Sequence, residues 1–138
     1  MLAQRRLTES QLWGRLQRKG FGEDDIRRAV ETCKADGYVD DRLFAQLFVE
    51  GKRKALGDVR LVGELVKRGI ERDAAARAVQ ASHITEEERC DDALTRVLGR
   101  NSFNFPAAAR SMERLGFPSS LVYRKLREHA QKQGTLAE

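Results

Sequence analysis

The sequence predicts an all-α protein, folded as an elongated array of three tandem three-helix repeats. Two observations favour helices: apolar residues recur at helical spacing along the chain, and only 2 prolines and 11 glycines interrupt its 138 residues. A third observation favours repeats. Gly20, Gly69 and Gly116 are each followed by a bulky apolar residue, and they are separated by 49 and 47 residues.

The residues around these glycines support the repeat, because apolar side chains recur at fixed distances from each glycine. Four residues before the glycines stand Leu16, Leu65 and Met112, and ten residues after them stand Val30, Val79 and Leu126. A three-helix unit cannot bury its apolar face alone, so the repeats are expected to stack into one continuous helical domain.

The period also predicts where each repeat begins. The first repeat is expected at residues 1–38, the second at 39–83, the third at 84–133, and a tail at 134–138. Because the first repeat would begin before Met1, its first helix is predicted to be short or missing.

Helix starts are predicted from capping residues. The segments Thr8–Gln11 and Thr85–Glu88 each have the spacing of a capping box, in which the first side chain caps the helix and the fourth reaches back. Asn104 is a candidate N-cap, and Pro106 falls in the first turn after it, where a missing N–H costs nothing.

The best-defined repeat is the second. Gly37 is expected to end one helix in the left-handed conformation, and Asp40 or Asp41 to open the next. Phe44 and Phe48 follow at helical spacing. We expect both rings to be buried between the first and second repeats.

Composition narrows the function. The net charge of +5 and the sequence pI of about 9.6 favour polyanionic partners such as nucleic acid or an acidic protein groove. Two cysteines, Cys33 and Cys90, do not make a disulfide framework and predict free thiols in a reducing compartment. The N-terminus lacks the apolar core of a signal peptide and no stretch is long enough to span a membrane, so a cytoplasmic protein is expected.

No pattern in the sequence predicts catalysis, a cofactor or a metal site. The two histidines, His83 and His129, are far apart, and no phosphate-binding loop, zinc motif or nucleophile motif occurs. The paired carboxylates at 40–41 and 91–92 are interpreted as helix caps and first-turn partners of the helix dipole.

Basic residues are the only functional cluster in the sequence. The candidates for binding an anionic partner are Lys52, Arg53, Lys54, Arg60, Lys67, Arg68, Arg15, Arg18 and Lys19. A second group, Arg124, Lys125 and Arg127, falls in the last predicted helix. The competing interpretation is an ordinary solvated face, which is the commonest fate of such residues.

The segment from Gly37 to Ala45, GYVDDRLFA, resembles the signature of the RecX regulatory proteins. The resemblance continues through Phe48, Arg53, Gly57, Arg60, Leu65 and the segment 67–70, and covers the chain from Thr8 to about Ala130. Val39 stands where leucine is usual, and the helix before Thr8 is shorter than the family pattern.

The resemblance implies three tandem three-helix repeats and a non-enzymatic regulator of the recombinase RecA, and we expect the chain to be a monomer. Such a protein binds the RecA filament on DNA, inhibits strand exchange and ATP hydrolysis, and acts in recombination, DNA repair and the SOS response. The filament is the expected partner, with single- or double-stranded DNA as a second candidate.

Two other functions remain open from the sequence. The helix pair at 58–69 and 71–81 could place a helix in a DNA groove, which would make the chain a helical protein that acts directly on DNA. A generic helical scaffold is the other alternative, and an enzyme comes last.

Overall fold

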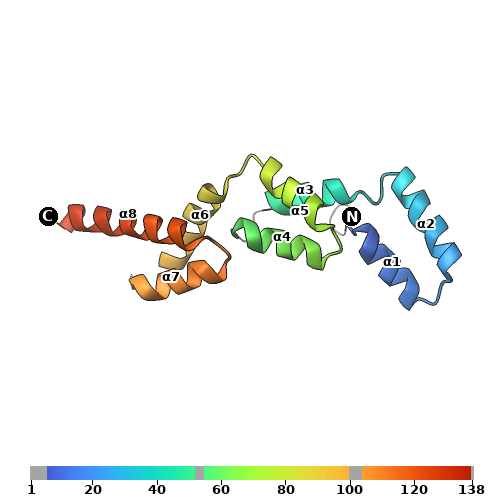
Figure 1. Cartoon of the computed structure of the whole chain (residues 1–138), viewed down its shortest axis with the longest axis horizontal. Coiled ribbons are helices and arrows are strands. Elements are labelled where there is room, and N and C mark those ends of the chain that lie inside the picture. Colours follow the sequence, from blue (N-terminus) through green and yellow to red (C-terminus); the bar gives the residue numbers. More distant parts are fainter. Residues whose placement is uncertain (1–5, 52–54, 100–103, 138) are drawn as a thin grey trace. The chain divides into compact units, whose positions relative to one another are not determined.

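The computed structural model describes residues 6–51, 55–99 and 104–137, and over these residues it contains eight helices and no strand (Figure 1). This confirms the predicted all-α class. The helices are α1 Glu9–Arg18, α2 Glu23–Ala35, α3 Asp41–Glu50, α4 Asp58–Lys67, α5 Arg72–Ala81, α6 Glu86–Leu98, α7 Phe105–Arg114 and α8 Ser119–Ala137. Helix α8 therefore continues through most of the residues for which the sequence predicts a tail.

The chain divides into two compact units. Unit 1 contains Met1–Glu50 and Val62–Ser82, and unit 2 contains Gly51–Leu61 and His83–Glu138. Helix α4 thus begins in unit 2 and ends in unit 1. The division does not coincide with the predicted repeat boundaries, which remain an interpretation of the sequence period.

The helix bounds recur at fixed offsets from the three aligned glycines. Gly20, Gly69 and Gly116 all have positive φ, at 90°, 94° and 93°, a conformation that glycine adopts without a steric penalty. The helices before them, α1, α4 and α7, each have ten residues, and the helices after them, α2, α5 and α8, each begin three residues later. These equal offsets support the three-repeat interpretation.

Each unit has its own apolar core. In unit 1 the helices α1 and α2, and α3 and α5, pack against each other, and the buried residues include Ile26, Val30, Leu65, Ala75 and Val79. In unit 2 the helices α6, α7 and α8 pack together around Cys90, Ala93, Met112, Phe117, Val122 and Leu126. The residues ten after each aligned glycine, Val30, Val79 and Leu126, are buried in every case.

The predicted caps are present at the start of α1 and α7. The Thr8 hydroxyl accepts from the Gln11 N–H while the Gln11 side chain accepts from the Thr8 N–H, which completes the capping box. The Asn104 side chain accepts from the Ala107 N–H, and Pro106 lies in the first turn. These helix starts are local, which is why the sequence predicted them.

The prediction that the rings of Phe44 and Phe48 are buried was wrong. Both rings are only half-buried, and the residues of α3 that face the core are their neighbours Ala45 and Val49, which are 2% and 3% exposed. The two rings stack at the edge of the core, with centroids 6.3 Å apart. The apolar face of α3 is broad, so spacing alone did not decide which side of it points inward.

Phe44→Ala is therefore expected to lower the free energy of unfolding by only about 1–2 kcal/mol, because part of the side chain is already in water. Val49→Ala removes two buried methyl groups and is expected to lower the free energy of unfolding by about 2 kcal/mol. This loss is at least as large as that for Phe44→Ala, although the change in side-chain volume is smaller. Urea unfolding of both variants measures this. A loss for Phe44→Ala well above that for Val49→Ala would mean that the ring is a core residue after all.

Candidate polyanion-binding surface

A groove with a volume of about 490 Å³ lies in unit 1 between α1 and the end of α4. We call it the basic groove. Four cationic side chains line it: Arg15, Arg18, Lys67 and Arg68. Its other lining residues are Leu7, Ser10, Gln11, Gly14, Val66 and Gly69. Two helices that are about 50 residues apart in the chain thus bring four of the predicted basic residues together.

Helix α1 supplies two of these cations at a spacing of three residues, which places both on one side of the helix. Arg15 and Arg18 are exposed, and within the described part of the chain neither forms an ion pair with a carboxylate. The Arg18 side chain lies over Gly14: a Cβ added to Gly14 would be 3.5 Å from the Nη1 atom of Arg18. Both guanidinium groups are therefore available to an anion.

Arg68 is held in place from three directions. Its Nη1 atom donates to the Glu64 carbonyl at 2.8 Å, and its guanidinium lies 4.6 Å from the centroid of the Phe48 ring. Its own carbonyl accepts a hydrogen bond of 2.5 Å from the Thr8 hydroxyl. Because the half-buried Phe48 supports Arg68, the stacked rings of α3 help to position a cation of the groove.

The carboxylate of Glu64 offsets part of the positive charge. Its oxygens lie 3.3 Å from the Lys67 Nζ atom and 3.8 Å from the Arg68 Nη1 atom. Glu64 does not line the groove, and it faces two of the four cations. The groove therefore keeps a net positive charge, with α1 as its unpaired side.

The other predicted basic residues lie elsewhere. Lys19 is exposed just beyond the end of α1 and does not line the groove. Arg60 belongs to unit 2, where it donates to the Arg114 carbonyl at 2.7 Å. Lys52, Arg53 and Lys54 lie outside the described residues.

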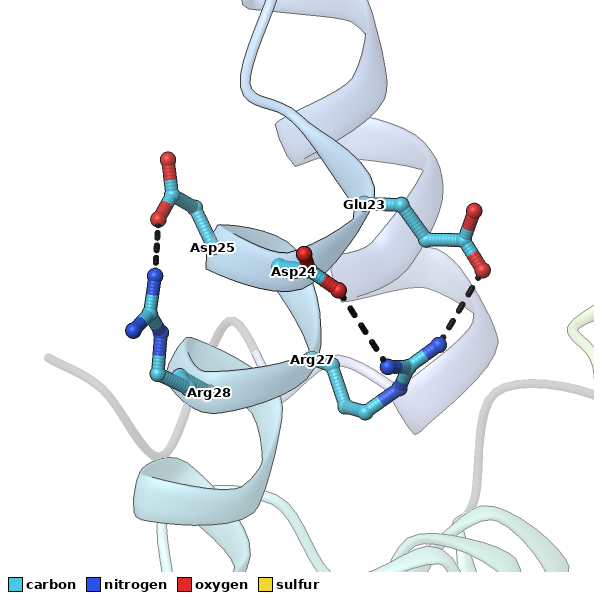
Figure 2. A network of polar contacts seen from close by, with 5 residues as sticks. All are labelled: Glu23, Asp24, Asp25, Arg27 and Arg28. Carbon is cyan, nitrogen blue, oxygen red and sulfur yellow. Dashed lines mark hydrogen bonds and ion pairs between the residues drawn. The ribbon is translucent and has the colours of Figure 1, made fainter.

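The basic residues in the first turns of α2 are paired with carboxylates. On α2, Arg27 lies 3.1 Å from Glu23 and 3.4 Å from Asp24, and Arg28 lies 2.6 Å from Asp25 (Figure 2). These exposed pairs lie along the first turns of one helix and contribute little to stability. The paired face of α2 is therefore a less favourable surface for an anion than the α1 side of the basic groove.

Two basic residues of α8, Arg124 and Lys125, form ion pairs within unit 2. Lys125 is almost buried and lies 2.8 Å from Glu87 and 3.0 Å from Asp91, while Arg124 lies 3.2 Å from Glu87. The hydrogen bond from Lys125 lowers the pKa of the Glu87 carboxyl, and the bonds to Glu87 and Asp91 raise the pKa of Lys125. This network connects α8 to α6, which makes the cluster at 124–127 a weaker candidate than the groove.

Sequence reasoning missed the uncharged residues of the groove. Ser10, Gln11 and Gly14 line it but carry no charge, so a search for basic clusters passes over them. The one available signal was Gly14, since a glycine inside a helix usually has a packing or functional reason. A Cβ at this position would lie 3.5 Å from the Arg18 Nη1 atom, an ordinary van der Waals distance, so packing against Arg18 does not require the glycine.

The described residues offer little for other chemistry. No group of three or more histidine, cysteine or acidic side chains among them could hold a metal ion. Their helices also include no candidate membrane span. Cys33 and Cys90 are free thiols, as predicted. Burial, together with the Asp91 carboxylate, raises the pKa of the Cys90 thiol to about 11, so this group is not a ready nucleophile.

Comparison with known proteins identifies the family. A protein described as regulatory protein RecX from Caldanaerobacter subterraneus is 37% identical over 89 residues, which are 64% of this chain and 45% of that protein. The RecX protein of Amycolatopsis mediterranei is 28% identical over 142 residues, covering 97% of this chain and 81% of the relative. This chain belongs to the RecX family of regulatory proteins.

The fold agrees with this assignment. The crystal structure of RecX from Lactobacillus salivarius matches with a TM-score of 0.73 and 17% identity, over 88% of this chain and 84% of that one. A second RecX crystal structure matches with a TM-score of 0.74 and 18% identity, over 92% of this chain and 67% of that one. No protein-family model matches the chain.

The match to the Caldanaerobacter relative covers less than half the length of that protein, and the match to RecX of Deinococcus radiodurans, at 28% identity, covers 65%. The comparisons therefore establish the family and the fold of this chain. Its activity and its partners are proposed below.

Proposed function

We propose that this RecX-family chain is a non-enzymatic regulator that binds RecA nucleoprotein filaments and inhibits recombinase, strand-exchange and ATPase activity. Family membership supports this function, because the relatives are described as regulatory proteins. The proposal places the chain in the cytoplasm, organised as three repeats with the second at 39–83 and the third at 84–133.

The observation that carries the proposal is the basic groove. A filament on DNA is an anionic surface, and cations from two helices converge on one groove whose α1 side is not neutralised. Arg15 and Arg18 are assigned the leading role, because they are exposed and unpaired within the described residues. Lys67 and Arg68 complete the surface, and Lys19, Arg60 and the run at 52–54 are candidates for additional contacts.

Replacing Arg15 and Arg18 together by glutamate is expected to weaken binding to RecA–DNA filaments by about tenfold or more at low salt, with loss of inhibition in proportion. The melting temperature should stay nearly unchanged, since exposed charges contribute little to folding. Binding by the parent should weaken steeply with added salt, and the variant should show a smaller salt dependence. Fluorescence anisotropy on preformed filaments measures the binding effects, and thermal unfolding by circular dichroism measures the melting temperature.

The matched control is Arg110→Glu with Lys132→Glu. These cations are exposed on α7 and α8, so the control changes the net charge by the same amount on unit 2. If both variants lose affinity equally, the effect is one of net charge, and the groove is an ordinary solvated face.

Direct action on DNA is the alternative, and the same assay separates it. Binding to bare DNA as tight as binding to filaments at matched salt would favour it. The geometry of α5 does not, because five of its ten residues are alanines, which cannot donate or accept hydrogen bonds at base edges.

A further inference from the structure

In two places a hydrogen bond joins the residue just before a helix to the carbonyl just before an aligned glycine, with a hydroxyl donor in one place and a backbone N–H donor in the other. In unit 1 the Thr8 hydroxyl, at the start of α1, donates to the Arg68 carbonyl at 2.5 Å. In unit 2 the Gly57 N–H, at the start of α4, donates to the Leu115 carbonyl at 2.9 Å. Thr8 and Gly57 each precede their ten-residue helix directly, and each acceptor directly precedes a glycine with positive φ.

The two contacts are also equally close. A Cβ on Gly69 would lie 2.2 Å from the Ser10 Cβ atom, and a Cβ on Gly116 would lie 2.4 Å from the Arg60 Cβ atom. Ser10 and Arg60 lie in the first turns of α1 and α4. The first turn of a helix thus packs directly on the glycine at both places, and we call this arrangement the junction.

The apolar residue after the glycine is buried at both junctions. Ile70 is 3% exposed and Phe117 is 4% exposed. At the first aligned glycine the arrangement is different: Phe21 is 53% exposed, and within the described residues no atom lies within 4 Å of a Cβ built on Gly20. No described hydrogen bond reaches the Lys19 carbonyl, which corresponds to the carbonyls of Arg68 and Leu115. This is the glycine side of a junction without a helix start packed against it. We call it the corner, and it consists of Lys19, Gly20 and Phe21.

The other side of a junction, the start of a ten-residue helix, is present at α7. Asn104 stands directly before this ten-residue helix, as Thr8 stands before α1 and Gly57 before α4. It is exposed, and its side-chain oxygen accepts from the Ala107 N–H, which leaves the amide Nδ2 free to donate. Pro106, in the first turn, is exposed as well. We call Asn104 and Pro106 the start surface.

We propose that the corner of one copy of this chain binds the start surface of a second copy and forms a third junction of the same kind. The Asn104 Nδ2–H of one copy donates to the Lys19 carbonyl of the other, as Thr8 does to Arg68, and Phe21 is buried as Ile70 and Phe117 are. The two surfaces differ, so the contact is heterologous, and each copy that joins keeps a free surface for the next one. This inference does not depend on which polyanion the basic groove binds, and it revises the expectation of a strict monomer.

The test starts with the unmodified chain in sedimentation velocity between about 10 µM and 1 mM, a range suited to one small contact. The weight-average mass is expected to rise by about twofold or more across this range. Phe21→Ser and Asn104→Asp are each expected to abolish the rise. The carboxylate introduced by Asn104→Asp can still accept from the Ala107 N–H and cap α7, but it has no N–H to donate, so loss of association would not reflect loss of the helix start.

Tyr38→Ser is the matched control. Tyr38 is also an exposed aromatic residue, 59% exposed, and it directly follows a glycine with positive φ, but it belongs to no junction. Its removal should leave self-association unchanged. If it abolishes association as Phe21→Ser does, exposed aromatic area in general drives the effect and the proposal fails.

Mixing the two variants gives the sharpest result. The Phe21→Ser chain keeps an intact start surface and the Asn104→Asp chain keeps an intact corner, so the equimolar mixture should form dimers and stop there. A contact between two Phe21 corners would instead leave Asn104→Asp self-associating on its own. That result would overturn the proposal, as would an unmodified chain that stays monomeric at about 1 mM.

Discussion

Gly69→Ala is expected to lower the free energy of unfolding by about 3 kcal/mol or more, which is a large part of the stability of a typical domain. Two penalties add. Gly69 has φ of 94°, and a side chain in that conformation costs about 1–2 kcal/mol. The new Cβ would also lie 2.2 Å from the Ser10 Cβ atom, and overpacking of this kind costs typically about 1–3 kcal/mol. Urea unfolding monitored by circular dichroism measures the loss.

Gly20→Ala separates the two penalties. Gly20 has nearly the same φ, 90°, but no described atom lies near the position of its Cβ. This variant should lose only the backbone part, about 1–2 kcal/mol. Equal losses for the two variants would show that the close packing of α1 on Gly69 does not contribute, and would remove one support for the junction.

Arg89→Met is expected to destabilise unit 2 by about 3 kcal/mol. Arg89, on α6, is 7% exposed and donates at 2.5 Å both to the Leu56 carbonyl and to the Asp58 carboxylate. It thereby connects the segment before α4 to α6. Removing the guanidinium leaves a buried carbonyl and a partly buried carboxylate without their partner, and that loss exceeds what the apolar methionine can return.

A double-mutant cycle with Asp58→Asn tests this explanation. The Asp58 carboxylate is about one third exposed, so water can satisfy part of it, and the coupling energy between the two residues is expected to be about 1–2 kcal/mol. Thermal unfolding of the four proteins gives the value. Strict additivity would show that Arg89 acts through the Leu56 carbonyl or through packing alone.

Features encoded within a few residues of the chain were predictable. The capping box at Thr8, the N-cap at Asn104 and the left-handed glycine at 37 depend on local hydrogen bonds and on the missing Cβ of glycine. The helix starts and ends followed from them. For the same reason the spacing of the glycines predicted the equal offsets of the helices around them.

Which basic residues act together was decided by tertiary structure. Arg15 and Arg68 are 53 positions apart, and the contact of α1 with the end of α4 places both in one groove. The run of basic residues at 124–127 looked similar in the sequence, but carboxylates of α6 take up Lys125. A run of basic residues in the sequence does not show whether carboxylates of another helix will pair with them.

The all-α class, the helix ends and the resemblance to RecX proteins could all be predicted from the amino-acid sequence, because each depends on short-range pattern. Tertiary structure decided that Ala45 and Val49, and not the rings beside them, face the core, and that a buried Arg89 connects two segments of unit 2. The physical reason is that burial and charge pairing are properties of the partner a side chain meets, and that partner lies far away in the sequence.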